Sequence, residues 1–144
     1  MQIKEVQSRE EISSTFPVIS QLYTHLSEET YIDDILNMTQ RGYKMVAVFE
    51  DENVSDGACI GITGIRITRK LGHGKVVEIE DFMISRDKRN IGVGKMLIRW
   101  VEWQAAIFKC NNIIGSLDTK REPSQKIFSR EKFLIAGISF KKSS

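Results

Sequence analysis

A short loop rich in glycine and positive charge is the part of this sequence with the clearest chemistry. It runs from Arg86 to Lys95, where an apolar stretch ends and an amphipathic helix is expected to begin. The first N–H groups of a helix lack partners and carry partial positive charge, so they accept an anion. Gly92 and Gly94 would let a phosphate approach without an obstructing Cβ, and Arg89 and Lys95 add formal charge. The loop therefore predicts an anion site, against the alternative of a solvated basic turn.

Two common phosphate motifs do not fit this loop. A P-loop needs glycine where Arg89 stands and Ser or Thr where Met96 stands, so magnesium would lack its hydroxyl ligand. The dinucleotide fingerprint G-x-G-x-x-G needs a third glycine where Leu97 stands. Nucleotide binding through either motif is therefore disfavoured.

Acidic residues interrupt the apolar stretch just before the loop. In an extended strand Glu78 and Glu80 project from one face, because they are two positions apart, and Asp81 points to the other. Carboxylates on a mostly apolar strand are costly to bury without a partner or a water-lined cleft. Either a lysine or arginine neutralises the two glutamates, or they face a reactive cleft.

A sheet and a long helix must position these groups, and the spacing of apolar residues predicts both. Lys75–Ser85 is nearly apolar apart from its acids, which is typical of a central strand. Apolar residues recur at helical spacing over Gly92–Phe108, which predicts an amphipathic helix. Asn112–Leu117 then suits a buried strand parallel to the central one, with that helix as the crossover.

The remaining segments complete a mixed sheet covered by helices. In chain order we expect a strand over Ile3–Val6, a helix capped by Ser8 that reaches Leu26 and bends or breaks at Pro17, a helix from Ser27 that Gly42 ends, strands over Tyr43–Glu50 and Cys59–Arg69 joined by a turn, a helix over Ser124–Phe133 and a last strand over Gly137–Lys141. The predicted fold class is therefore α/β.

Composition limits what such a protein can bind. The chain has 144 residues, which fits one domain of about 100 to 150 residues, over 1–144. Its 21 Lys and Arg against 19 Asp and Glu give a net charge of +2, too balanced for a nucleic-acid-binding face. No window approaches the about 18 apolar residues of a membrane span. We expect no nucleic acid, no membrane and a cytoplasmic location.

Metal and disulfide chemistry are not expected. Cys59 and Cys110 form no C-x-x-C pair, which fits a reducing compartment. Neither His25 nor His73 has a second histidine at ligand spacing. The predicted site therefore holds no metal.

The sequence R-x-x-G-x-G at Arg89, Gly92 and Gly94, directly after a strand, resembles the pyrophosphate loop of the GNAT superfamily of acetyl-CoA-dependent N-acetyltransferases. Ile79–Ile84 is similar to the family's central strand, and residues 121–133 are similar to its carboxy-terminal helix, which in many members reads R-E-x-A-x-x-F-Y-x-x-x-G-F. The order of elements also matches over nearly the whole chain. The resemblance implies one GNAT-like domain with a central, mostly antiparallel sheet, a splayed parallel pair and helices on both faces.

The resemblance also implies which residues bind the acetyl-CoA co-substrate. The pyrophosphate would be held by backbone N–H groups of Asn90, Ile91, Gly92, Val93, Gly94 and Lys95, with Arg89 at the first corner of the loop. Pantetheine would pair like an extra strand with Phe82, Met83 and Ile84. An N–H group there would polarise the thioester carbonyl, which is oxyanion stabilisation.

The reaction that this family catalyses needs a base. An alkyl amine titrates near about 10.4, like lysine, so it must lose a proton before its lone pair attacks a thioester. Glu80 and Glu78, just before the pantetheine segment, are the candidates, acting through a water. The acceptor would be a primary amine of a small molecule or peptide.

The chain departs from its relatives at the carboxy-terminal helix. Phe128 stands where many members have the tyrosine that protonates the departing thiolate, and Lys132 replaces the usual glycine. A thiolate is a fair leaving group, so water or Ser129 could replace that acid. The alternative is a catalytically silent acyl-CoA-binding regulatory module. Trp103 lies off the core stripe of the long helix, and it is a candidate for a homodimer surface.

Overall fold

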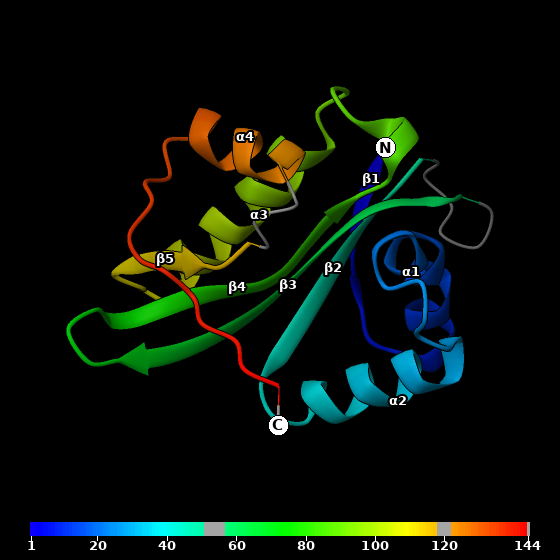
Figure 1. Cartoon of the computed structure of the whole chain (residues 1–144), viewed down its shortest axis with the longest axis horizontal. Coiled ribbons are helices and arrows are strands. Elements are labelled where there is room, and N and C mark those ends of the chain that lie inside the picture. Colours follow the sequence, from blue (N-terminus) through cyan, green and yellow to red (C-terminus); the bar gives the residue numbers. More distant parts are fainter. Residues whose placement is uncertain (51–56, 118–121, 144) are drawn as a thin grey trace.

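The computed structural model describes residues 1–50, 57–117 and 122–143, which form a five-stranded sheet with helices on both faces (Figure 1). The elements in chain order are β1 (Gln2–Val6), α1 (Arg9–Leu22), α2 (Glu28–Thr39), β2 (Tyr43–Phe49), β3 (Cys59–Lys70), β4 (Gly74–Ile84), the 3-10 turn η1 (Arg86–Lys88), α3 (Val93–Ile107), β5 (Asn112–Gly115) and α4 (Glu122–Arg130). The strand order is β1-β2-β3-β4-β5, antiparallel except for the parallel pair β4-β5. The predicted fold class is confirmed. The turn expected between β2 and β3 lies mostly outside the described residues.

The helices divide the core into two layers, one on each face of the sheet (Figure 1). On one face α1 and α2 pack through Ile12, Ile19 and Ile35 against alternate residues of β2 and against Cys59 and Ile62 of β3. On the other face α3 packs through Leu97 and Ile98, both fully buried. Side chains that alternate along the strands supply both layers, because successive residues point to opposite faces.

The first helix starts where the sequence predicts and ends sooner. The Ser8 hydroxyl accepts a bond from the Glu11 N–H, and the Glu11 carboxylate accepts from the Ser8 N–H, which closes a capping box. Pro17 lies inside α1 without breaking it, and the helix ends at Leu22 rather than reaching Leu26.

The last strand predicted by the sequence is wrong. Gly137–Lys141 is irregular, and Ile138 and Phe140 remain 83% and 93% exposed. The hydroxyl of Ser139 contacts that of Ser116 at 3.0 Å, one residue beyond the last paired residue of β5. The segment therefore passes the end of β5 instead of running along its edge. Its alternating apolar residues have no neighbouring strand with which to pair.

None of the helices in the described residues is long and apolar enough to span a bilayer.

Candidate functional site

The loop between β4 and α3 presents the start of α3 to the surface. Gly92 is the N-cap of α3, with φ of 93°, and it offers no side chain to bond the first N–H groups of the helix. Asn90 also has a positive φ of 67°, so the backbone turns sharply twice before the helix begins. The side chains of Arg89 and Lys95 are exposed beside it. The loop therefore gathers backbone amides and positive charge, the arrangement that an anion needs.

The two glycines of the loop have different roles. A Cβ on Gly92 would contact nothing within 4 Å, so glycine is needed there for its left-handed backbone. A Cβ on Gly94 would lie 3.0 Å from Ile127 and 3.1 Å from Ile84. Gly94 thus allows α3 to pack closely against β4 and α4. The sequence suggested that both glycines keep the loop surface free of a Cβ, but only Gly92 does so.

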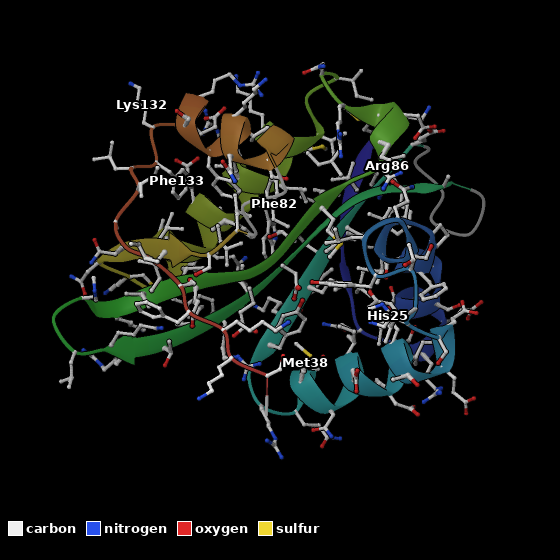
Figure 2. The ribbon with its side chains drawn as sticks, viewed as in Figure 1. His25, Met38, Phe82, Arg86, Lys132 and Phe133 are labelled. Atoms are coloured by element: carbon white, nitrogen blue, oxygen red, sulfur yellow. The ribbon has the colours of Figure 1, made fainter. Side chains whose placement is uncertain are left out.

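A hydrogen-bond network fixes the loop to the end of α1. The Gln21 side chain donates to Ser85 Oγ at 3.0 Å and accepts from the Arg86 N–H at 3.0 Å. The Arg86 guanidinium donates in turn to the Gln21 carbonyl at 3.2 Å, and Figure 2 shows Arg86 at this junction. Ser85 Oγ also donates to Asp87 and holds the pKa of that carboxyl below its usual value. Sequence reasoning missed Gln21, because nothing near it in the chain resembles a motif.

The parallel strands β4 and β5 separate next to this loop. Their pairing covers Val76–Ile79 of β4 and stops there, so Phe82, Met83 and Ile84 lie beyond the last residue paired with β5. The Ser85 N–H donates to the Ile60 carbonyl of β3. Since N–H directions alternate along a strand, the Ile84 N–H points away from β3, toward the open side. The splayed pair implied by the resemblance is confirmed.

A β-bulge in β4 changes the direction of its acids. Gly64 of β3 pairs with Asp81, whereas the next residue of β3 pairs with Ile79, so Glu80 is the extra residue. Ile79 and Phe82, on either side of the bulge, both pack in the core layer under α3. Asp81 consequently joins Glu80 on the face covered by α1 and α2. The expectation that Asp81 points to the opposite face from the glutamates was wrong, because alternation breaks at a bulge.

Both predicted catalytic glutamates form ion pairs. Glu80 accepts from the Arg66 guanidinium at 3.0 Å, and Glu78 accepts from the Lys70 ammonium at 3.0 Å. All four side chains remain a quarter to two-fifths exposed. The ion pairs therefore agree with the alternative in which an arginine or lysine neutralises each glutamate. Both carboxylates nevertheless remain accessible to water.

Asp81 has a different partner, which the sequence did not reveal. The hydroxyl of Tyr43 donates to Asp81 Oδ2 at 2.6 Å, and the Tyr43 side chain is only 2% exposed. Burial and the neighbouring carboxylate raise the pKa of Tyr43 well above its usual value, so the phenol stays protonated. A Cβ on Gly64 would lie 1.6 Å from the Tyr43 oxygen, so glycine is required across the sheet.

Helix α4 closes the site beside β4. The ring of Phe128 lies 4.7 Å from that of Phe82, and Phe133 packs edge-on against Phe128 at 5.1 Å. The helix ends in a Schellman motif, in which the Phe133 N–H bonds the Phe128 carbonyl and Lys132 adopts a φ of 70°. Figure 2 shows Phe82, Lys132 and Phe133 around this helix. Lys132 thus occupies a left-handed position that favours glycine.

The cysteines and possible metal ligands offer no competing chemistry. Cys59 is buried, and desolvation raises its pKa to about 12, so its thiol is a poor nucleophile. Within residues 1–50, 57–117 and 122–143, no group of three or more His, Cys, Asp or Glu could hold a metal ion.

A shallow depression of about 650 Å³ follows the outer side of α3, next to β1. Its lining includes Ile3, Lys95, Arg99 and Trp103. Trp103 is 59% exposed, whereas Trp100 packs partly against the core, as its place on the helix stripe predicts. A homodimer surface at Trp103 stays a prediction.

Comparisons with known proteins agree with this architecture. The sequence profile described as Acetyltransferase (GNAT) family matches residues 8–131. An uncharacterized N-acetyltransferase, YhdJ of Bacillus subtilis (strain 168), is 27% identical over 103 residues, which are 70% of this chain and 69% of that protein.

Solved structures share the fold at low sequence identity. The ribosomal-protein-alanine N-acetyltransferase from Brucella melitensis biovar Abortus 2308 superposes with a TM-score of 0.82, at 13% identity and 100% coverage of both chains. The aminoglycoside N-acetyltransferase AAC(6')-Iy, solved in complex with CoA, gives a TM-score of 0.81 at 17% identity, over 99% of this chain and 93% of that one.

Proposed function

Because the chain belongs to the GNAT acetyltransferase family, we propose that it moves an acetyl group from acetyl-CoA to a primary amine by direct attack in a ternary complex. The observation that carries this proposal is the uncapped start of α3 beside the open end of β4. One ligand, acetyl-CoA, could place its diphosphate on these amides and its thioester along β4. Residues 1–144 would make up one cytoplasmic N-acetyltransferase domain.

The proposed donor site uses the backbone more than side chains. Asn90, Ile91, Gly92, Val93, Gly94 and Lys95 would hold the pyrophosphate of coenzyme A, with Arg89 at the corner. Pantetheine would run along Phe82, Met83 and Ile84, with Phe128 beside the sulfur. The direction of the Ile84 N–H supports a strand-like pairing with the pantetheine amides.

The proposed reaction removes two protons from the acceptor ammonium group and returns one to the departing thiolate. A carboxylate of β4, Glu80 or Glu78, takes a proton from the acceptor ammonium through a water. The amine nitrogen then bonds the thioester carbon, the carbon–sulfur bond breaks, and the thiolate of coenzyme A leaves. The attacking nitrogen loses its second proton to water, and water or Ser129 supplies a proton to the thiolate, since Phe128 has none to give. One proton is released to solvent overall.

The ion pairs of the glutamates do not exclude this role. Arg66 and Lys70 hold the two carboxylates in fixed places while leaving them partly exposed. An exposed ion pair contributes only about 0 to 1 kcal/mol, so it yields readily to a substrate. Glu80 is the nearer of the two to the open end of β4, because Glu78 still lies opposite Ile114 of β5.

A catalytically silent acyl-CoA binder is the second candidate. It is favoured by Phe128, which packs between two other rings at the position where many relatives have tyrosine. Such a protein would bind coenzyme A through the same loop without releasing thiol.

Calorimetry followed by a thiol-release assay tests both candidates. Acetyl-CoA should bind, whereas ATP and NAD should not. Release of free thiol from acetyl-CoA with a panel of amines identifies the enzyme, and binding without release identifies the silent module. Failure of coenzyme A to bind would contradict both.

A further inference from the structure

Resting on the proposed function, we propose that Asp81 binds the ammonium group of the acceptor and that Tyr43 positions Asp81 for this role. The proposal concerns an acceptor-binding carboxylate distinct from Glu80 and Glu78. It also assigns a chemical class to the acceptor, namely an alkylamine that is cationic at neutral pH.

The balance of charges on β4 singles out Asp81. Glu78, Glu80 and Asp81 share one face of the strand because of the bulge. Each glutamate has a cation 3.0 Å away. In the part of the chain that the structure describes, Asp81 has no lysine, arginine or histidine nitrogen within 4.0 Å, and its side-chain partner is the neutral phenol of Tyr43. One negative charge on this face is therefore uncompensated.

The bond from Tyr43 orients the carboxylate without saturating it. The phenol donates to Oδ2 alone, and an ionised carboxylate can accept about four hydrogen bonds. Tyr43 is itself fixed, because its side chain is buried and passes over Gly64, where any Cβ would collide with it. Asp81 thus keeps acceptor sites for an ammonium group and holds them in one place.

The surroundings of Asp81 favour a tight ion pair. Its side chain is half-buried on the face covered by α1 and α2. Burial raises the pKa of the neighbouring Tyr31 phenol of α2, and the Asp81 carboxylate raises it further. The Tyr31 hydroxyl is already occupied by Thr15 at 2.6 Å. A charge pair in such a partly dehydrated place is stronger than one in bulk water.

The position along β4 joins this carboxylate to the proposed donor site. Asp81 follows Ile79, the last residue paired with β5, by two residues, and it precedes Phe82, Met83 and Ile84 directly. An ammonium bound to Asp81 would therefore stand beside the strand segment assigned to the thioester. Glu80, next in sequence and on the same face, could then take the proton.

The test measures acceptor binding and turnover separately in the full chain. The probes are benzylamine and spermidine as cationic alkylamines and 4-aminobenzoate as an arylamine that is uncharged at nitrogen. Binding to protein saturated with coenzyme A is followed by calorimetry, and turnover with acetyl-CoA by thiol release. The variants are Asp81→Asn, which keeps the side-chain shape, and Tyr43→Phe, which removes only the hydroxyl. Asp34→Asn, an exposed carboxylate on α2, is the matched control.

The expected result is a selective loss of alkylamine binding. Asp81→Asn should weaken binding of the alkylamine that binds best, and raise its KM, by at least about tenfold while kcat changes less. Tyr43→Phe should raise the same KM by a smaller factor, and Asp34→Asn should change nothing. Binding of coenzyme A and of 4-aminobenzoate should be unaffected in all three.

The binding arm keeps this proposal separate from the proposed function. Suppose that an alkylamine binds, that Asp81→Asn abolishes this binding, and that no amine is acetylated. The role of Asp81 in binding is then supported, and the proposed acetyltransferase activity is wrong. Wild-type affinity in Asp81→Asn, or no alkylamine binding to the wild-type protein, overturns the role of Asp81. Circular dichroism checks folding, and Asp81→Ser replaces Asp81→Asn if the latter does not fold.

Discussion

The ring of Phe128 in α4 lies 4.7 Å from the ring of Phe82 in β4, with 60° between their planes. This contact attaches α4 to the strand segment that we assign to the thioester. It also places a ring without a hydroxyl where the family resemblance leads us to expect tyrosine. Two measurable consequences follow from the pair, one for turnover and one for stability.

We predict that Phe128→Tyr does not reduce turnover, because the added hydroxyl provides an acid for the thiolate and the ring stays in place. Phe128→Ala should lower the free energy of unfolding by about 3 kcal/mol, since contacts with Phe82 and Phe133 are both lost. Thiol release and urea denaturation measure the two effects. A severe loss of turnover in a folded Phe128→Tyr protein would contradict the placement of this residue near the sulfur.

Lys132→Gly should raise the free energy of unfolding by about 1 kcal/mol, because Lys132 has a φ of 70° that glycine adopts without steric cost. The hydrogen bonds of the Schellman motif involve only backbone groups, so they survive the change. Urea denaturation measures the gain.

Arg130→Gly is the control for that substitution. Arg130 is the last residue of α4 and has no positive φ, so glycine there should destabilise the protein by up to about 1 kcal/mol. The same sign of change at both positions would show that the left-handed backbone is not the cause.

Gly64→Ala should destabilise the protein by at least about 2 kcal/mol, since its methyl group would collide with the buried ring of Tyr43. Gly137→Ala, where a Cβ would meet nothing within 4 Å, should leave stability unchanged. Combining Gly64→Ala with Tyr43→Leu should recover part of the loss, whereas Tyr43→Phe should not, because ring atoms also lie within 2.7 Å. Thermal unfolding of the set decides, and an unchanged Tm for Gly64→Ala would refute the contact.

Glu80→Gln and Glu78→Gln separate stability from catalysis. Each removes one partner of a partly exposed ion pair, so the free energy of unfolding should change by less than about 1 kcal/mol. Glu80→Gln should lower kcat by about 100-fold if Glu80 is the base. If neither variant slows the chemical step of an active preparation, the base lies elsewhere.

Cys59 should resist alkylation in the folded protein. Burial raises the pKa of its thiol to about 12, against an ordinary value of 9.0, so the thiolate is scarce at pH 8. Iodoacetamide should react with the half-buried Cys110 first, and with Cys59 only after unfolding. Mass spectrometry locates the adduct, and equal labelling of both thiols would show that Cys59 is not buried.

The same pKa shift predicts a pH dependence of stability. The unfolded state loses the thiol proton near pH 9 and the folded state near pH 12, so the contribution of Cys59 is complete below pH 9. It declines as pH rises from 9 to 12. Cys59→Ala should lack this part of the alkaline decline in urea denaturation.

Periodic features of the sequence were predictable, and single irregular ones were not. The spacing of Val93, Leu97 and Val101 gives one apolar face and predicts α3, and the glycine-rich segment before it predicts the exposed helix start. The facing of Asp81 was mispredicted because a bulge is set by the pairing of two strands, which alternation in one strand cannot show.

Long-range partners set the other limits. Gln21 reaches Arg86 across 65 positions of the chain, and only the folded structure brings them together. Ile138 and Phe140 alternate as a strand would, yet β5 is only four residues long and the segment passes its end. The local pattern of apolar residues shows which secondary structure a segment can adopt. Whether the segment adopts it depends on the neighbouring strand or helix that the fold provides.

The bulge at Glu80 also has a consequence for how such a protein can diversify. Glu78, Glu80 and Asp81 face α1 and α2, while Ile79 and Phe82 face α3, so the acids of this strand and its apolar core residues lie on opposite sides of the sheet. Exchanging these acids can therefore change selectivity for the acceptor without altering the core contacts that fix the strand under α3. The extra residue in β4 is what brings all three acids to the same side of the sheet.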